Sequence, residues 1–208
     1  MKVAYISKNF FFVKAVFDHM ISGMLVLALL PLFFLIALLV KLEDPQSPIL
    51  FKQIRIGKNE VPFTMFKFRT MVPDAEDLLE KLLDQNEVEG HMFKMKKDPR
   101  VTKIGFYLRK YSLDELPQLF NVLIGDMSLI GPRPSLKHEV DYYTRYERQR
   151  FYVKPGCSGL WQVSGRNLLN FDEMIELDLV YINQMSIYQD IKIFFKTIYV
   201  VITGQGAF

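Results

Sequence analysis

Residues that would point to a specific chemistry are scarce in this sequence. It contains one cysteine, Cys157, and three histidines among 208 residues. A disulfide framework and a zinc site with the usual ligand spacing are therefore excluded, so any metal must be held by oxygen ligands. Eleven glycines without a period exclude a collagen-like chain. The charges nearly cancel, with 26 basic and 23 acidic residues, and we expect no nucleic acid among the partners.

Apolar residues are abundant for a chain in which 24% of the residues are charged. They make up 50% of the sequence, and the mean hydropathy is +0.11. Much of this excess lies in residues 20–40, which are 21 consecutive residues without a charge. A helix of that length spans roughly 30 Å, the thickness of a bilayer's hydrocarbon core. Since no small-residue cleavage site follows before Lys41, we expect a retained membrane segment rather than a signal peptide.

Two features of this segment argue against a straight crossing. Pro31 lies in its middle, where proline removes a helix hydrogen bond and clashes with the preceding turn. Both flanks are basic, with Lys2, Lys8 and Lys14 before the run and Lys41, Lys52, Arg55 and Lys58 after it. The positive-inside preference keeps such flanks on the cytoplasmic side. We predict a re-entrant membrane helix within residues 1–42, broken at Pro31, and a cytoplasmic domain over residues 43–208, with a kinked crossing as the alternative.

The pattern of the remaining chain predicts a mainly helical α+β domain. Two strand-like runs, residues 49–55 and 63–69, are separated by a turn at 57–60 and predict a β-hairpin. Helical spacing of apolar residues predicts helices over 74–86, from about 114 to 124, over 171–183 and over 188–203. Gly125 is placed to end the second of these. The last helix suits a core position and a membrane surface equally well.

Two blocks of opposite charge are hidden in the total. Residues 72–90 carry seven acids and one lysine, whereas residues 94–110 carry seven basic residues and one acid. We interpret the acidic block as a solvated helix face. In the basic block, Ile104, Phe106 and Tyr107 alternate with the cations. This mixture is typical of an interfacial element that faces anionic headgroups or phosphates.

Asp114 and Glu115 are the first candidates for chemistry. They precede Pro117, and because proline is tolerated in the first turn of a helix, we expect the helix to begin at about Asp114. The positive end of the helix dipole would then hold a carboxylate ionised, which suits a nucleophile or a metal ligand. The alternative is structural, because Ser112 to Glu115 also fits an S-x-x-E capping box.

Five basic residues supply the context of this carboxylate pair. Arg133 stands between two prolines, so its backbone is stiff and extended. Arg109 lies five residues before the pair, Lys67 and Arg69 end the predicted hairpin, and Arg166 follows a glycine. Each of them alone is best interpreted as a surface charge. Together, beside two carboxylates and a membrane segment, they indicate an anionic, phosphate-bearing substrate at the bilayer surface.

The central motifs resemble those of a known family. SLDELPQLFNVL at residues 112–123 and GDMSLIGPRP at 125–134 resemble the bacterial sugar transferases, also called monotopic polyprenyl-phosphate phosphoglycosyl transferases. The resemblance continues through KFRTM at 67–71, DPR at 98–100, KPG at 154–156, GLWQVSGRN at 159–167 and ELD at 176–178. It covers nearly the whole chain from about Lys14.

The resemblance implies a re-entrant helix, a cytoplasmic catalytic α/β domain, Mg²⁺ and an Asp–Glu dyad. By position, Asp114 is the nucleophile and Glu115 its partner, both at the metal, and Arg133 contacts phosphate. Weaker expectations are phosphate contacts by Arg109, Lys67, Arg69 and Arg166 and supporting roles for Asp178 and Asp190. The sequence departs from the family at Leu30, where a serine is usual before the proline. We assign no chemistry to Cys157.

The implied reaction is the transfer of a sugar 1-phosphate from a UDP-sugar, with glucose or galactose expected, to undecaprenyl or another polyprenyl phosphate. It releases UMP through a covalent aspartyl phosphosugar intermediate and begins capsule or exopolysaccharide assembly on the cytoplasmic face of the bacterial inner membrane. Two alternatives stay open: a direct glycosyltransferase would release UDP, and a non-catalytic membrane scaffold would release no nucleotide. A homo-oligomer is compatible with each of them.

Overall fold

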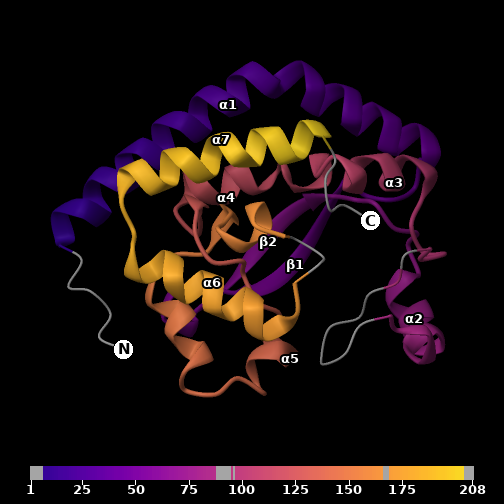
Figure 1. The fold of residues 1–208 in the computed structure, drawn as a ribbon. Coiled ribbons are helices and arrows are strands. Elements are labelled where there is room, and N and C mark those ends of the chain that lie inside the picture. Colours follow the sequence, from indigo (N-terminus) through magenta and orange to yellow (C-terminus); the bar gives the residue numbers. More distant parts are fainter. Residues whose placement is uncertain (1–6, 88–94, 96, 166–168, 204–208) are drawn as a thin grey trace.

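The longest element of the computed structural model is the 36-residue helix α1 (Lys8–Glu43), which the N-cap Ser7 precedes. The structure describes residues 7–87, 95, 97–165 and 169–203. By length and composition α1 is sufficient to cross a membrane. The helix is continuous through Pro31, so the predicted break is not confirmed. Instead α1 arches over the rest of the chain (Figure 1), as expected when a proline bends a helix without unwinding it.

The first half of α1 is joined to the body by buried polar contacts. Lys14 Nζ donates to Asp190 Oδ2 at 2.6 Å, and Ser128 Oγ donates to Asp18 Oδ2 at 2.7 Å. Tyr181 Oη donates to Asp190 Oδ1 at 2.6 Å. The charge of Lys14, which the sequence suggested as a cytoplasmic flank, is therefore paired inside the protein. Asp190, expected to support the site, lies in this contact between α1 and the body.

The predicted hairpin is confirmed. Strands β1 (Leu50–Ile56) and β2 (Pro62–Phe68) are antiparallel, and a short turn over Lys58–Glu60 joins them. The register pairs Arg55 with Phe63 and Phe51 with Lys67. Because successive side chains of a strand alternate between the faces, Arg55 and Lys67 share one face of the hairpin.

Helices surround this hairpin (Figure 1). Gly125, at a φ of 100°, ends helix α4 as predicted, and the helix expected over 171–183 is confirmed as α6. The predicted 74–86 helix is a short α-helix continued as a 3₁₀-helix over Glu80–Gln85. A parallel pair of short strands was not predicted. The elements after the hairpin are α2 (Ala75–Leu79), α3 (Lys103–Lys110), α4 (Gln118–Ile124), β3 (Ser128–Ile130), α5 (Lys137–Val140), β4 (Gly156–Ser158), α6 (Phe171–Asn183) and α7 (Ile187–Thr203).

Two clusters of buried side chains hold α1 against the body. The larger one includes Met65, Val122 and Leu179, and α1 adds Leu25 to it. In the smaller one, Ile36 and Val40 of α1 pack with Phe68 and Leu108. Burial of large apolar side chains stabilises a fold by about 1.5 to 3 kcal/mol each. Both halves of α1 are therefore packed against the body, and this packing fixes the position of the helix on the body.

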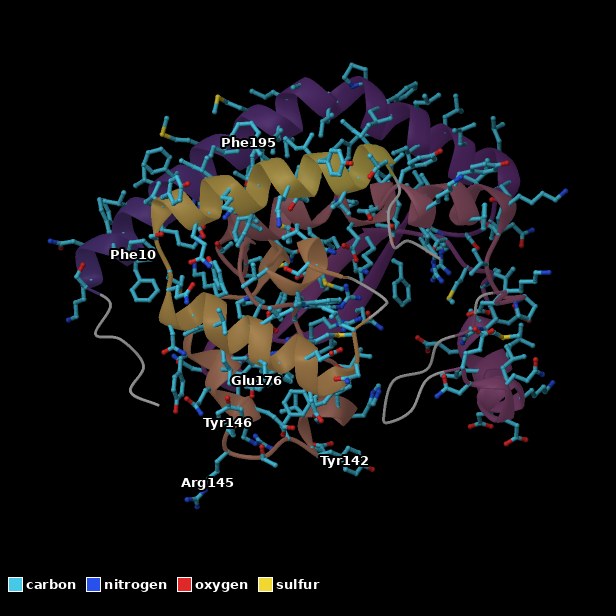
Figure 2. All side chains as sticks on the ribbon, in the orientation of Figure 1. Phe10, Tyr142, Arg145, Tyr146, Glu176 and Phe195 are labelled. Carbon is cyan, nitrogen blue, oxygen red and sulfur yellow. The ribbon has the colours of Figure 1, made fainter. Side chains whose placement is uncertain are left out.

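The opposite side of α1 and the neighbouring helices expose large apolar side chains. Phe34 of α1 is 74% exposed and Phe195 of α7 is 65% exposed. In Figure 1 helices α3, α4 and α7 lie beneath the arch of α1, and Figure 2 shows Phe195 near α1, whereas Arg145 lies at the far end of the body. Many exposed large apolar side chains on these helices are typical of a protein that contacts a membrane or another protein.

Candidate functional site

The carboxylate pair lies on a 3₁₀ turn before α4, not at the start of that helix. Ser112 adopts a left-handed conformation with a φ of 52°, the turn covers Leu113–Glu115, and α4 begins at Gln118 after the N-cap Pro117. The Ser112 side chain does not cap the turn. The prediction that the α-helix begins at about Asp114 is therefore wrong by about one turn, because the chain first forms a 3₁₀ turn, and the alternative of a capping box is not found.

Asp114 is buried, with 8% of its surface exposed. Burial raises its pKa to about 6; the charge of Lys67 opposes this rise, the charge of Glu115 adds to it and that of Arg109 opposes it. The expected effect of a helix dipole is therefore wrong in direction. Desolvation of the charged form dominates at this position, and the carboxylate is ionised above about pH 6.

The pKa of Glu115 is shifted in the opposite direction. Burial alone would raise its pKa, but the charges of Lys67 and Arg133 outweigh burial and lower the pKa well below its usual value. Lys67 Nζ donates to Glu115 Oε1 at 2.7 Å, and Arg133 Nη1 lies 3.6 Å from the same oxygen. Two adjacent carboxyl groups with pKa values driven apart are typical of a site in which they have different roles.

The packing of α4 on the hairpin brings Lys67 to the dyad. Asn121 of α4 is fully buried; its side chain accepts from Phe66 N at 3.0 Å and donates to Thr64 O at 2.7 Å. These two bonds fix the register of α4 against β2. Since Lys67 follows Phe66 and Glu115 precedes α4, the same contacts set the distance between the two charged groups.

Arg133 and Arg109 approach the dyad from two other segments. Arg133 follows β3, has a side chain that is 39% exposed, and lies over the ring of Trp161 at 5.9 Å. Arg109 ends α3 and donates from Nε to Thr70 Oγ1 at 2.9 Å. Burial lowers the pKa of Arg109, while the charge of Asp114 raises it. Both guanidinium groups therefore act electrostatically on the carboxylates, and their expected contacts with a substrate phosphate stay predictions.

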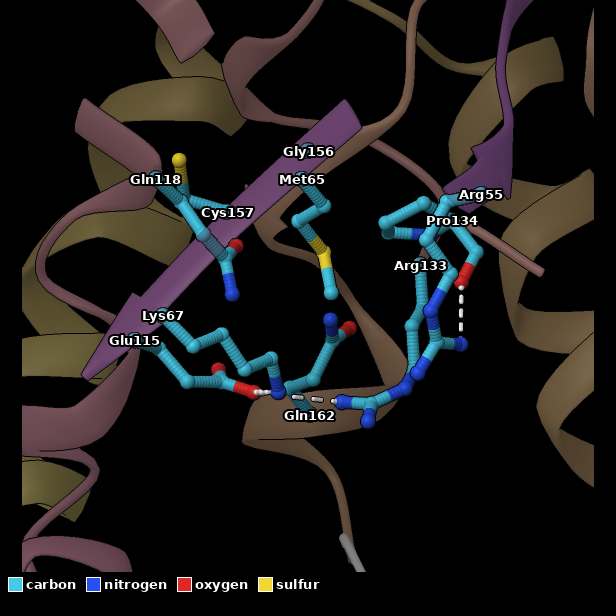
Figure 3. Close-up of a pocket in the computed structure, with 10 residues that line it drawn as sticks. All are labelled: Arg55, Met65, Lys67, Glu115, Gln118, Arg133, Pro134, Gly156, Cys157 and Gln162. Atoms are coloured by element: carbon cyan, nitrogen blue, oxygen red, sulfur yellow. Dashed lines mark hydrogen bonds and ion pairs between the residues drawn. The ribbon is translucent and has the colours of Figure 1, made fainter. Parts of the chain in front are cut away.

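A small, open recess lies beside Glu115. Figure 3 shows Lys67, Glu115 and Arg133 together at one end of it. Sequence reasoning missed three polar residues of its lining, Arg55, Gln118 and Gln162. Arg55 could have been found from the hairpin register, because it shares a face with Lys67. The full lining is Arg55, Met65, Lys67, Glu115, Gln118, Arg133, Pro134, Gly156, Cys157 and Gln162.

Other predicted site residues lie elsewhere. Arg69 donates from Nε to Pro48 O at 3.1 Å and lies over the ring of Phe51. Asp178 is fully buried in an ion pair with Arg150. Asp190 pairs with Lys14, as described above. Arg166 lies outside the described residues.

Cys157 lines the recess without being an alternative nucleophile. It is partly buried and free of any disulfide. Burial raises the pKa of its thiol far above the usual value. Because the thiolate is the reactive form of cysteine, this position contributes shape to the recess and no covalent chemistry.

The dyad fits a magnesium ion only in company with a substrate. Among the residues that the structure describes, no group of three or more His, Cys, Asp or Glu side chains is placed to hold a metal. Asp114 and Glu115 offer hard carboxylate oxygens, and Mg²⁺ is commonly bound by one or two carboxylates together with water and substrate phosphates. The residues present therefore match a metal that arrives with a diphosphate.

The fold and the site together define a class of protein: a membrane-length apolar helix packed on a small body, with a buried aspartate next to a glutamate that pairs with two cations in a recess. Sequence comparison identifies the class. The sequence model of the bacterial sugar transferases matches residues 9–204, and the chain belongs to this family.

Named relatives are similar over most of the chain. It is 46% identical over 188 residues to the galactosyl transferase CpsE of Streptococcus agalactiae, covering 90% of the chain and 41% of the relative. It is 40% identical over 201 residues to the undecaprenyl-phosphate galactose phosphotransferase of Salmonella typhimurium, covering 95% and 42%. It is 42% identical over 211 residues to the undecaprenyl-phosphate glucose phosphotransferase of Komagataeibacter xylinus, covering 94% and 37%. The chain thus spans about two-fifths of the length of these relatives.

Proposed function

We propose that this chain transfers a sugar 1-phosphate from a UDP-sugar to a polyprenyl phosphate such as undecaprenyl phosphate, and that UMP is released. The observation that carries the proposal is the buried Asp114 carboxyl beside Glu115, Lys67 and Arg133. The names of the relatives favour galactose or glucose as the sugar. This reaction is the first membrane step of capsule or exopolysaccharide assembly.

In the first step Asp114 acts as the nucleophile. A carboxylate oxygen of Asp114 attacks the phosphorus that carries the sugar, an aspartyl–phosphate bond forms, and the anhydride bond to the α-phosphate breaks. Its electron pair leaves with UMP. The acyl phosphate so formed is itself reactive, so much of the free energy of the anhydride is kept for the next transfer. The carboxylate is the required form of Asp114, and its pKa of about 6 provides this form at neutral pH.

In the second step the lipid phosphate regenerates the enzyme. An oxygen of the polyprenyl phosphate attacks the same phosphorus, the aspartyl–phosphate bond breaks, and Asp114 recovers its carboxylate. The product is a polyprenyl diphosphate sugar. Because the two anionic substrates react in turn with Asp114, they never need to meet in one transition state.

The cations of the site bind and orient the phosphates. Lys67 and Arg133 already face the same oxygen of Glu115, and a substrate phosphate can take the place of that carboxylate between them. Arg109 adds positive charge near Asp114. Mg²⁺, held by Glu115 and Asp114 with the diphosphate, would offset negative charge on the phosphates when bound. Positioning and charge compensation supply most of the catalysis in phosphoryl transfer.

Helix α1 is proposed to enter and leave the membrane on the cytoplasmic face of the bacterial inner membrane. The arch of the helix through Pro31 supports this topology (Figure 1). The exposed apolar side chains of α3, α4 and α7 would lie at the interface, with Asp114 at the depth of the lipid phosphate. Thiol labelling of Ser7→Cys and Lys41→Cys in a Cys157→Ala background tests it. Modification of both positions from the cytoplasmic side alone is expected, and labelling from opposite sides would indicate a crossing.

Identification of the released nucleotide tests the reaction. Membranes that contain the protein are incubated with UDP-galactose or UDP-glucose, Mg²⁺ and undecaprenyl phosphate. The proposal predicts UMP, and a phosphosugar adduct on Asp114 by mass spectrometry when the lipid is omitted. Release of UDP would indicate a direct glycosyltransferase, and release of neither nucleotide would favour a scaffold.

A further inference from the structure

The backbone carbonyls of the segment that carries Arg133 are hydrogen-bonded in an unusual way. Residues 131–135 run from β3 towards the edge of the hairpin and include Pro132 and Pro134, which have no N–H to donate. Their carbonyl groups still require donors. Gly156 N donates to Pro132 O at 2.8 Å, and Ile56 N donates to Ser135 O at 2.9 Å. The two ends of the segment are therefore held by backbone groups from different sheets.

The two carbonyls between these ends are bound by arginine side chains. Arg150 Nη2 donates to Arg133 O at 3.0 Å, and Arg55 Nη1 donates to Pro134 O at 3.0 Å. All four successive carbonyls from Pro132 to Ser135 thus have a donor. Two guanidinium groups supply what a neighbouring strand would supply in a regular sheet.

Both arginines are themselves fixed. Arg150 is 6% exposed, forms an ion pair with the fully buried Asp178, and donates from Nη1 to Tyr143 Oη at 3.2 Å. Arg55 is 7% exposed and donates from Nε and Nη2 to Gln53 Oε1 at 3.0 and 2.7 Å. Nη1 and Nη2 of Arg150 are therefore bound by the buried Tyr143 and Asp178, whereas its Nε has no partner among the described residues. Arg55 is held by the half-buried Gln53. These contacts leave both guanidinium groups little freedom to rotate.

Close packing of Gly156 against Gly131 also fixes this segment. A Cβ atom on Gly156 would lie 2.1 Å from Gly131 N, so the two backbones approach more closely than any other residue would allow. Burying charged side chains is costly unless they are paired. A purely structural solution could have used neutral donors, whereas here two buried cations bind the backbone of the segment that carries Arg133, and one of them, Arg55, itself lines the recess.

We propose that Arg150, held by Asp178, and Arg55, held by Gln53, are positioning residues that aim the Arg133 guanidinium at a substrate phosphate. The inference rests on the proposed function, since it deepens the role of Arg133 in that site. Arg150 acts through the backbone of residue 133 and lies outside the lining of the recess, whereas Arg55 acts through the backbone of residue 134 and also lines the recess.

Arg148 provides a matched control for Arg150. Its side chain also pairs with a carboxylate, Glu60, at 2.6 Å. It also donates to two backbone carbonyls, those of Tyr143 at 3.2 Å and Val140 at 2.9 Å. These partners lie in and after α5 and in the hairpin turn rather than in the Arg133 segment. Arg148→Lys therefore measures the loss of stability and activity that follows when any guanidinium group with several hydrogen bonds is replaced by an ammonium group.

The decisive experiment is a double-mutant cycle on UMP release, with Arg150→Lys, Arg133→Ala and both together. Arg150→Lys is expected to lower kcat/KM for the UDP-sugar by roughly 10- to 100-fold, chiefly through KM, because a small displacement of a binding group is costly. Arg148→Lys is expected to change kcat/KM by less than about twofold. In the Arg133→Ala background, Arg150→Lys should have almost no further effect, since residues that act as a unit are not additive.

A second readout does not depend on turnover. The stabilisation of the protein by UDP in thermal unfolding should be lost in Arg150→Lys and Arg133→Ala and kept in Arg148→Lys. If Arg150→Lys does not fold, Asp178→Asn, which removes the charge that holds Arg150 and lies outside the recess lining, replaces it in the same cycle with the same expectation. Multiplicative effects in the cycle, or equal losses in Arg150→Lys and Arg148→Lys, would overturn the inference. If the wild type releases no UMP while the UDP stabilisation follows the predicted pattern, the proposed function fails and the positioning role stands.

Discussion

Replacing Asp114 by asparagine is expected to stabilise the fold above pH 6 while it abolishes transfer. The reason is that burial raises the pKa of this carboxyl from its ordinary value of 3.8 to about 6. Between these two values the folded protein binds a proton that the unfolded chain has released. Stability therefore falls as the pH rises through this window, and the full cost is present above pH 6.

The size of the effect follows from the same numbers. One pKa unit corresponds to about 1.4 kcal/mol, so moving the titration from 3.8 to about 6 means that the ionised Asp114 costs the fold about 3 kcal/mol at pH 8. Asparagine has nearly the same shape and no charge. For a chain of this size, a gain of that order raises the midpoint of thermal unfolding by roughly 6 to 12 °C.

Thermal unfolding of the wild type and of Asp114→Asn in one detergent, at pH 8 and at pH 4, measures this gain. The difference in midpoint should be large and positive at pH 8 and much smaller at pH 4, which is close to the pKa of Asp114 in the unfolded chain and well below that in the folded protein. A lower midpoint for the variant at pH 8, or an equal gain at both pH values, would show that burial does not control the charge of Asp114. Glu60→Gln, at an exposed carboxyl, is the control and should change neither midpoint.

Three further predictions concern the charges around the dyad. The charge of Glu115 raises the pKa of Asp114, and that of Lys67 lowers it. The rate of adduct formation should fall on the acid side of its pH profile near pH 6, and this fall should move to lower pH in Glu115→Gln and to higher pH in Lys67→Met. Shifts of the two variants in the same direction would contradict the electrostatics. Chelation by EDTA should abolish UMP release, and added Mg²⁺ should restore it; full turnover in EDTA would remove the metal from the proposal. Asp178→Leu alone should cost about 3 to 5 kcal/mol of stability by leaving Arg150 unpaired, whereas Arg150→Met with Asp178→Leu should recover most of this loss but not the activity, as measured by denaturant unfolding and UMP release.

The elements with strong local signals could be predicted from the sequence. The 171–183 helix and the end of α4 at Gly125 match the structure because periodicity and a left-handed glycine decide them locally. The hairpin also matches the structure, because two strand-like runs and the turn between them are local signals. The start of α4 could not be predicted from its local pattern, because Ser112 takes a left-handed conformation that the sequence S-x-x-E does not suggest.

The candidate site was predicted in its charged members and missed in its lining. Lys67 and Arg133 meet Glu115 as expected, whereas Arg69 does not, because β2 ends at Phe68 and the alternation of faces ends with it. Gln118 and Gln162 come from segments whose proximity depends on the tertiary packing of the chain. The rise in the pKa of Asp114 likewise depends on burial, which no local pattern encodes.

The resting arrangement of the dyad bears on how a carboxylate can attack a phosphorus that already carries negative charge. Such an attack requires cations at the phosphate and a nucleophile that is not hydrated. In this structure Glu115 pairs with Lys67 and Arg133, while Asp114 is buried, so that at neutral pH its carboxylate is ionised but poorly hydrated. On the proposed mechanism, Glu115 thus keeps the two cations oriented until a diphosphate replaces it, so that little reorganisation remains for the reaction itself. The two adjacent acids then differ in role because Glu115 pairs with the cations and Asp114 is buried.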